Sequence, residues 1–147
     1  MKKFLSILLA GLLLSLCAMP CFADSMTIST NADSAAWSLS YPADTQIPWE
    51  ASAQSIGEIK AETMLIPPGK TVEVTVTSAN AYRLVHQTDA DSQIAYTLLG
   101  ADAVAFFPGD YGKAFPLSVT VAEDQWRYAA AGEHTDQLTF TAEYKDA

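Results

Sequence analysis

The chain has 147 residues, half of them hydrophobic, and a formal net charge of −9 at neutral pH. Two cysteines and two histidines are too few for a disulfide-rich scaffold or for a Cys/His zinc site. The acidic balance repels polyanions, so neither a nucleic acid nor an anionic membrane surface is an expected partner.

Residues 1–23 have the organisation of a secretory signal peptide. Two lysines precede an apolar run at residues 4–16, and residues 21–23 (CFA) end in a small-x-small cleavage pattern. The run is shorter than the roughly 20 apolar residues of a spanning helix. A lipid anchor at Cys17 or Cys21 is the alternative, but Leu16 and Pro20 stand where a lipidation motif requires a small residue. We therefore expect cleavage after Ala23.

Cleavage at this site leaves residues 24–147 as a single acidic domain. The leader removes both cysteines and two of the eight basic residues, so six basic side chains remain against 17 acidic ones, a net charge of −11. The loss excludes disulfides and a cysteine nucleophile. The remaining length suffices to bury a core without covalent cross-links. We predict a secreted protein, extracellular or associated with the cell surface, that does not insert into the membrane.

Alternation of apolar and polar residues predicts β-strands along the mature chain. A strand sends successive side chains to opposite faces, so this period indicates half-buried strands. We expect the tryptophan of the second such segment, Trp37, to lie in the core. The segments are residues 26–29, 37–41, 71–77, 82–86, 93–98, 117–121 and 138–144, with a short apolar run at 104–107.

The remaining segments are less regular. Residues 56–66 fit a strand or a short helix, and Gly57 with the β-branched residues favours the strand. Residues 42–55 contain two prolines and are expected to form an ordered loop or an edge segment. Residues 67–69 (PPG) and 108–109 (PG) supply the proline and glycine that tight turns require. Short strands separated by such turns predict an all-β fold, an antiparallel β-sandwich.

The end of the chain resembles a known group of domains. Residues 132–141 (GEHTDQLTFT) are similar to the G-x-Y-T-D-x-L/V-T-F/V-T ending of small secreted bacterial immunoglobulin-like domains, which include pilin-like and spore-coat-U-like surface proteins. Residues 68–70 (PGK) also resemble the mid-domain turn of such modules. The resemblance implies an immunoglobulin-like sandwich of about seven to nine strands and a structural or adhesive role. It also implies a tyrosine corner at the position of His134, whose ring could donate a comparable hydrogen bond.

Candidate metal ligands are few. His86 and His134 lie far apart in sequence and outside any paired motif, so we interpret both as structural or surface residues. Asp89 and Asp91 (HQTDADSQ) are the best calcium candidates, because hard cations prefer clustered oxygen ligands. The glycine and closing glutamate of an EF-hand loop are missing, and a solvated acidic turn is the alternative. We expect no other cofactor.

The sequence contains no motif that assigns catalytic residues. It lacks a G-x-S-x-G elbow and a glycine-rich phosphate loop, and its many acids single out no carboxylate pair. We therefore predict a protein without enzymatic activity, a structural or adhesive module that acts by contact with other proteins and can self-associate.

A binding module for carbohydrate or peptide is the alternative function. Its candidate residues are Trp49, Trp126 and Tyr128, because an exposed aromatic ring can stack on the face of a sugar; a peptide could instead pair with an exposed edge strand. A competing interpretation is that the two tryptophans close the open ends of the sandwich. In either case the expected partner is a protein or a glycan at the cell surface.

Overall fold

The computed structural model describes Met26 and residues 28–30 and 35–147, and the fold below is that of the domain within residues 35–147. The predicted signal peptide lies outside the described residues. Met26 and Ile28 are exposed and belong to no strand, so the prediction of a first strand is wrong at these positions, and Thr27 is not described. A four-residue alternation cannot show whether a neighbouring strand is available to pair with it.

Nearly all regular structure in the domain is strand, which confirms the all-β prediction. The described residues form ten strands, all paired antiparallel, and one short helix. No helix among them has the length and apolar character needed to cross a membrane. The elements are β1 (Ala36–Ser40), β2 (Ala53–Leu65), β3 (Lys70–Ser78), β4 (Arg83–His86), β5 (Gln93–Ala95), β6 (Thr97–Leu99), β7 (Val104–Phe106), β8 (Ala114–Thr120), α2 (Glu123–Arg127), β9 (His134–Thr135) and β10 (Leu138–Asp146).

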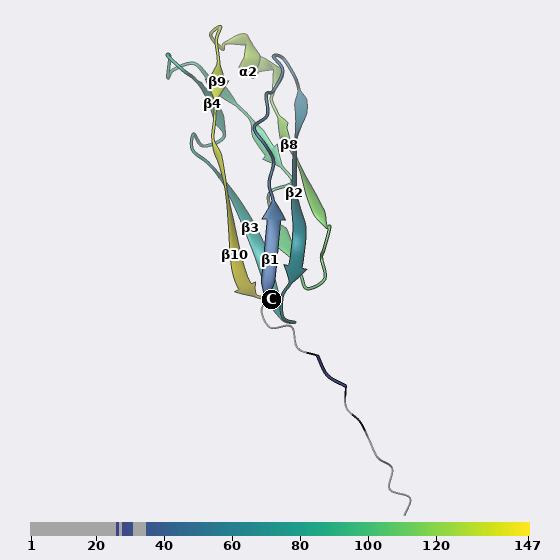
Figure 1. The fold of residues 1–147 in the computed structure, drawn as a ribbon. Coiled ribbons are helices and arrows are strands. Elements are labelled where there is room, and N and C mark those ends of the chain that lie inside the picture. The colour runs from purple at the N-terminus through teal and green to yellow at the C-terminus, as the bar shows by residue number, and fades with distance from the viewer. Residues whose placement is uncertain (1–25, 27, 31–34) are drawn as a thin grey trace, which may run out of the picture. The chain divides into compact units, whose positions relative to one another are not determined.

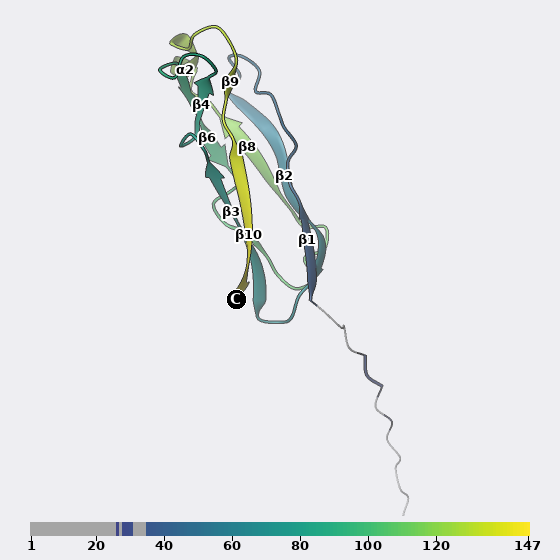
Figure 2. The ribbon, with the colours of Figure 1, turned by 60° about the vertical axis from the view of Figure 1, so that its left-hand side comes forward.

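The strands of residues 35–147 form three sheets with the orders β1-β2-β8-β6, β10-β3-β7 and β5-β4-β9. β4 follows β3 along the chain and β9 leads into β10, so the third sheet extends the second. Figures 1 and 2 show β4, β9 and α2 together at one end of the domain and the C-terminus at the other. The immunoglobulin-like strand arrangement remains a prediction.

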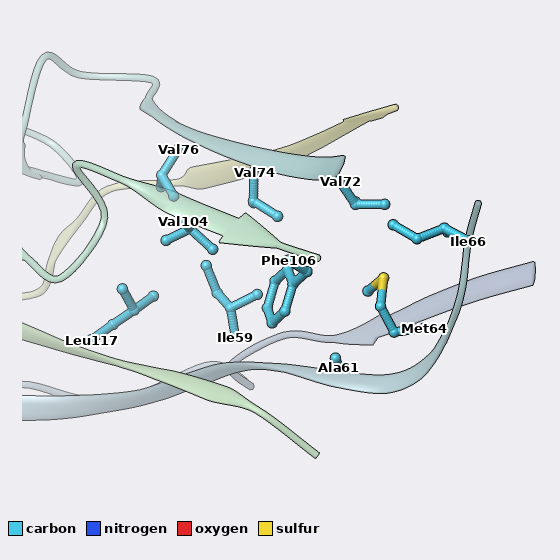
Figure 3. Packing of buried hydrophobic residues seen from close by; sticks show 10 residues of the cluster. All are labelled: Ile59, Ala61, Met64, Ile66, Val72, Val74, Val76, Val104, Phe106 and Leu117. Atoms are coloured by element: carbon cyan, nitrogen blue, oxygen red, sulfur yellow. The ribbon is translucent and has the colours of Figure 1, made fainter. Parts of the chain in front are cut away.

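The main core lies between the four-stranded sheet and the β10-β3-β7 sheet (Figure 3). Alternate residues of β3 point into it from one side, and residues of β2 and β8 meet them from the other. Phe106 of β7 is fully buried at the centre. The buried members are Ile59, Ala61, Met64, Ile66, Val72, Val74, Val76, Val104, Phe106 and Leu117. Residues 56–66, ambiguous in sequence, thus supply strand residues to the core, as favoured.

The closing strand β10 pairs with β3 along its whole length, from Leu138 opposite Ser78 to Asp146 opposite Lys70. Leu138, Phe140 and Ala142 pack against the core while the intervening threonines are exposed. The predicted alternation is therefore confirmed from Leu138 to Ala142, whereas Tyr144, of the same parity, is 42% exposed.

The predicted turns are also present. Gly69 has φ of 76° and the Lys70 amide donates to the Pro67 carbonyl (3.3 Å). Gly109, with φ of 87°, lies in a similar turn closed by a 3.1 Å bond from Asp110 to Phe107. Both glycines adopt the left-handed conformation that tight turns require.

Trp37 does not lie in the core, contrary to the prediction. It remains 37% exposed, because β1 is the edge strand of its sheet and pairs, within the described domain, with β2 alone. The β-bulge in this pairing lies in β2, because Ser38 pairs with Thr63 and Leu39 with Ala61, which leaves Glu62 without a partner in β1. Only Leu39, beyond the bulge, packs against the core.

Candidate functional site

A groove of the described domain lies between residues 42–49, in the connection from β1 to β2, and residues 132–140 around β9 and β10. It consists of a larger hollow of about 660 Å³ and a smaller one of about 280 Å³. Both are lined by Thr45, Ile47, Leu84 and Asp136, so we treat them as one continuous groove.

The floor of the groove is apolar. Under the larger hollow it consists of Leu84, Ile94 and Trp126, and under the smaller one of Ile56, Tyr96 and Val119. Most of these side chains belong to a second hydrophobic cluster, made of buried Ile94, Tyr96, Val119, Val121 and Trp126 with Ile56 and Leu84 packed against it. The groove therefore lies on a rigid surface, because its floor is itself part of the core.

Side chains hold the loop of residues 42–49 in place. Pro42 packs so closely on Gly57 that a Cβ at that glycine would lie 3.0 Å from the Pro42 Cβ. Ile47 packs on the second cluster, and Trp49 lies against Trp126 with ring centroids 5.1 Å apart. Within the described part, the backbone groups of this loop accept two hydrogen bonds, from Ala51 N to Pro48 O (3.1 Å) and from the Thr45 hydroxyl to Ala43 O (3.0 Å). The loop is thus fixed while most of its backbone groups are unpaired.

The opposite wall also presents an unpaired backbone edge. Among the described residues β10 pairs only with β3, and β9 only with β4. Just before β10, the Gln137 carbonyl accepts a hydrogen bond from the Ala79 amide. This pair continues the β10–β3 register, so Thr139 and Thr141, two and four residues later, also direct their backbone groups to β3. In an antiparallel ladder the residues between them direct N–H and C=O to the other edge. Leu138 and Phe140, which line the groove, are such residues.

Asp136 connects the β9–β10 wall to two other parts of the chain, residues 78–80 and Tyr96. Its carboxylate accepts hydrogen bonds from the Ser78 and Tyr96 hydroxyls (2.6 Å each) and from the backbone amides of Asn80 (3.1 Å) and Gln137 (2.7 Å). Burial, with the hydrogen bond to Asp136 and its negative charge, raises the pKa of the Tyr96 hydroxyl well above its usual value. The bonds fix the wall in position.

The two histidines, far apart in sequence, lie opposite each other where β4 pairs with β9. The rings of His86 and His134 meet edge to face with centroids 4.9 Å apart. His134 lines the larger hollow and bonds through Nε2 to the Ser92 hydroxyl (3.0 Å) and through Nδ1 to the Gly132 carbonyl (3.1 Å). Both rings take part in structural contacts.

The domain contains a tyrosine whose hydroxyl bonds to a backbone carbonyl earlier in the chain, as in a tyrosine corner. This residue is Tyr82, whereas the resemblance implied the position of His134. The Tyr82 hydroxyl donates to the Val76 carbonyl, six residues earlier, over 3.0 Å. Tyr82 has φ of 60°, and its amide donates to the Ser78 hydroxyl (2.6 Å). These bonds hold Tyr82 in the left-handed conformation that non-glycine residues rarely adopt.

The structure brings two of the three predicted aromatic binding residues together. Trp49 is 52% exposed, Trp126 is buried, and both line the larger hollow. Trp126 Nε1 is buried and has no hydrogen-bond partner among the residues that the structure describes. Tyr128, at the C-terminal end of α2, is 83% exposed and does not line the groove. The burial of Trp126 agrees with the interpretation that this ring closes an end of the domain, whereas Trp49 keeps an accessible surface.

The predicted calcium ligands lie outside the groove, in the turn between β4 and β5. The Asp89 carboxylate accepts a bond from the Asp91 amide (3.1 Å), and the Asp89 carbonyl accepts one from Ser92 (3.1 Å). In the part of the chain that the structure describes, no group of three or more His, Cys, Asp or Glu residues is arranged to hold a metal ion. Calcium binding here stays a prediction.

Charges of the domain are distributed unevenly around the groove. Five of the six basic residues of 35–147 form salt bridges, namely Lys60, Lys70, Lys113, Arg127 and Lys145, and the sixth, Arg83, bonds to Gln93. None of the six lines the groove, which is lined instead by Asp44, Glu133 and Asp136. Sequence analysis identified neither these acids nor residues 42–47 as site residues.

No protein-family model matches the chain, and comparisons with curated proteins and with solved structures likewise find no match.

Proposed function

We propose that the mature domain is a non-enzymatic secreted or surface protein that acts by contact, and that its groove takes an extended segment of a partner protein. The observation that carries this proposal is a groove with an apolar floor and, among the described residues, unpaired backbone groups along both walls. The structural or adhesive role expected from the sequence then acquires a defined contact surface.

A peptide in extended conformation suits both features of the groove. Its backbone would pair with the free N–H and C=O groups of β10, which supplies affinity through the mode known as β-augmentation. Alternate side chains would point to the apolar floor, because a strand sends every second side chain to the same face. The wall from His134 to Phe140 spans roughly 20 Å of extended chain, enough for about six peptide residues.

A carbohydrate-binding role is the second candidate, favoured by the half-exposed ring of Trp49 among polar neighbours. Thr45, Gln46 and Glu133 line the same hollow and could hydrogen bond to sugar hydroxyls. The two candidates make different demands, since a sugar would use the Trp49 face and would leave the β10 edge unpaired.

Selection from a phage-displayed library of random nine-residue peptides, with the mature domain as target, tests the proposal. Enriched peptides should bind in the micromolar range or tighter. Binding should slow amide hydrogen exchange at Leu138 and Phe140 and leave Thr139 and Thr141, already bonded to β3, unchanged. N-methylation of alternate peptide amides should abolish binding, because it removes the donors that pair with β10.

A glycan array probed with the same protein completes the experiment. Failure to enrich any peptide, together with glycan binding that is lost in Trp49→Ala, would replace the proposal by the carbohydrate role. Peptide binding without protection of Leu138 and Phe140 would place the contact elsewhere and also overturn the proposal.

A further inference from the structure

We infer that the partner segment carries a basic side chain, arginine by preference, which binds at the larger end of the groove between the Trp49 ring and the Glu133 carboxylate. The inference rests on the proposed function and specifies the chemistry of the partner.

Charge complementarity is the first argument. The acids that line the groove form no salt bridge with any basic residue of the described domain, because the basic side chains are engaged elsewhere. A cation from outside the domain is therefore the complement that the groove lacks. The apolar floor strengthens this attraction, because a charge pair is less screened beside a low-dielectric surface.

Trp49 supplies the second argument. Indole is the most favourable ring for a cation, and contact requires an open face within about 6 Å of the charge. Packing on Trp126 holds Trp49 while leaving it half exposed at the hollow. The cation–π contacts within the described domain involve Lys70 with Tyr144 and Lys113 with Phe107 and Phe115, so Trp49 has no internal cation.

Glu133 supplies the anion on the opposite wall of the same hollow. Its Oε2 accepts a hydrogen bond from the Gln87 side chain, and its backbone carbonyl accepts one from the Gln87 backbone N–H. These two bonds hold Glu133 in position at the larger hollow. The other carboxylate oxygen has no hydrogen-bond partner in the part of the chain described here. It is available to a guanidinium group.

Arginine suits a site between an indole ring and a carboxylate better than lysine does. Its planar guanidinium can stack on an indole face and donate to a carboxylate at the same time, whereas the lysine ammonium is a compact, strongly hydrated charge. The expected partner segment therefore combines apolar residues at alternate positions along the floor with an arginine near one end.

The library selection described above provides the first test. Peptides enriched on the mature domain should contain arginine or lysine more often than the unselected library. The best arginine peptide is then compared with a copy in which citrulline, uncharged and of nearly the same shape, replaces the arginine. We expect the citrulline peptide to bind about tenfold more weakly in 50 mM salt, with a smaller difference in 500 mM salt.

Two variants locate the contact. Glu133→Gln keeps a side chain that can bond to Gln87 and should reduce the preference for arginine over citrulline about threefold. Trp49→Leu keeps an apolar side chain and should reduce it similarly. Asp102→Asn is the matched control, since it removes one exposed acid from a turn that does not line the groove. Unfolding temperatures of the variants exclude loss of the fold as the cause.

The outcomes separate this inference from the proposed function. Equal binding of the arginine and citrulline peptides would overturn the inference and leave a peptide-binding groove intact. If both Glu133→Gln and Trp49→Leu still prefer the arginine peptide over the citrulline peptide as strongly as the unchanged domain does, the contact with Glu133 and Trp49 is overturned. Failure to enrich any peptide overturns the proposed function, and this inference with it.

Discussion

The Tyr96 hydroxyl donates a 2.6 Å hydrogen bond to the Asp136 carboxylate and thereby joins two places where the chain leaves one sheet for another. Tyr96 stands between β5 and β6, which pair with β4 and β8 in different sheets. Asp136 stands between β9 and β10, which pair with β4 and β3. The bond therefore ties the end of the domain that carries the larger hollow to the main sheets.

Replacement of Tyr96 by phenylalanine should destabilise the domain while its ring continues to fill the same space. The lost bond has a carboxylate as acceptor, so we expect the free energy of unfolding to fall by about 1.5–3 kcal/mol. Urea denaturation followed by tryptophan fluorescence measures this change. Tyr128→Phe, at an exposed ring, is the control and should have no measurable effect.

Stability should also decline at alkaline pH. The pKa of Tyr96 is raised in the folded domain, first by burial and then by the bond to Asp136 and its charge, whereas an unfolded tyrosine ionises near pH 10. The stabilising contribution is thus fully present below about pH 10 and is lost as the pH rises towards the folded pKa, because the unfolded state releases its proton first. Urea titrations between about pH 8 and pH 11 should show the decline.

The same titration of Tyr96→Phe supplies the control for the pH dependence. Burial also raises the pKa of Tyr41, which contributes a slope of the same sign, so Tyr96→Phe should reduce the alkaline decline without removing it. An unchanged slope would show that Tyr96 is not the responsible group.

Gly132→Ala should be more harmful than an ordinary turn substitution. Gly132 has φ of 141°, and a Cβ there would lie 2.2 Å from His86 Nε2. The ring cannot shift without loss of its 3.2 Å bond to the Ala131 carbonyl. We expect a loss of stability of about 2 kcal/mol or more, from backbone strain and the clash together.

Two further variants separate the causes of the Gly132→Ala effect. Gly109 also has positive φ but has open space where a Cβ would stand, so Gly109→Ala should show the strain alone, about 1 kcal/mol. In a His86→Ala background the cost of Gly132→Ala should fall towards that value. Strict additivity of the two substitutions would contradict the steric explanation.

Alternation predicted most strands because their inner residues face the main core or the second hydrophobic cluster. It could not predict that residues 93–98 form two strands, since Ile94 and Leu98 face the interior on both sides of the crossing at Tyr96. The helix α2 was also missed, because five residues are too few to display a helical period. The sequence therefore predicted which residues face the interior more accurately than it predicted where each strand ends and which strand it pairs with.

Prediction of the site from sequence was less complete. The aromatic pair Trp49 and Trp126 was among the candidates, but residues 42–47 and 132–140 meet only through the fold, and neither segment contains a motif for peptide binding. The pairing of His86 with His134 depends on strand register, which local alternation does not determine. Asp136 belongs to the motif of residues 132–141 that resembles other domains. It was the one feature of the sequence that pointed to the hydrogen-bonded wall of the groove.

Neighbouring phenylalanines in β7 and just after it provide a direct test of the inferred strand faces. Phe106 is fully buried against Phe115 (ring centroids 5.1 Å apart), whereas Phe107 is 47% exposed. Phe106→Ala should lower the free energy of unfolding by about 3–5 kcal/mol, because it removes buried apolar surface and leaves a cavity. Phe107→Ala should cost less than about 1 kcal/mol, since its ring already contacts water. Equal losses of stability, measured by urea denaturation, would mean that the side chains of Phe106 and Phe107 do not point to opposite faces.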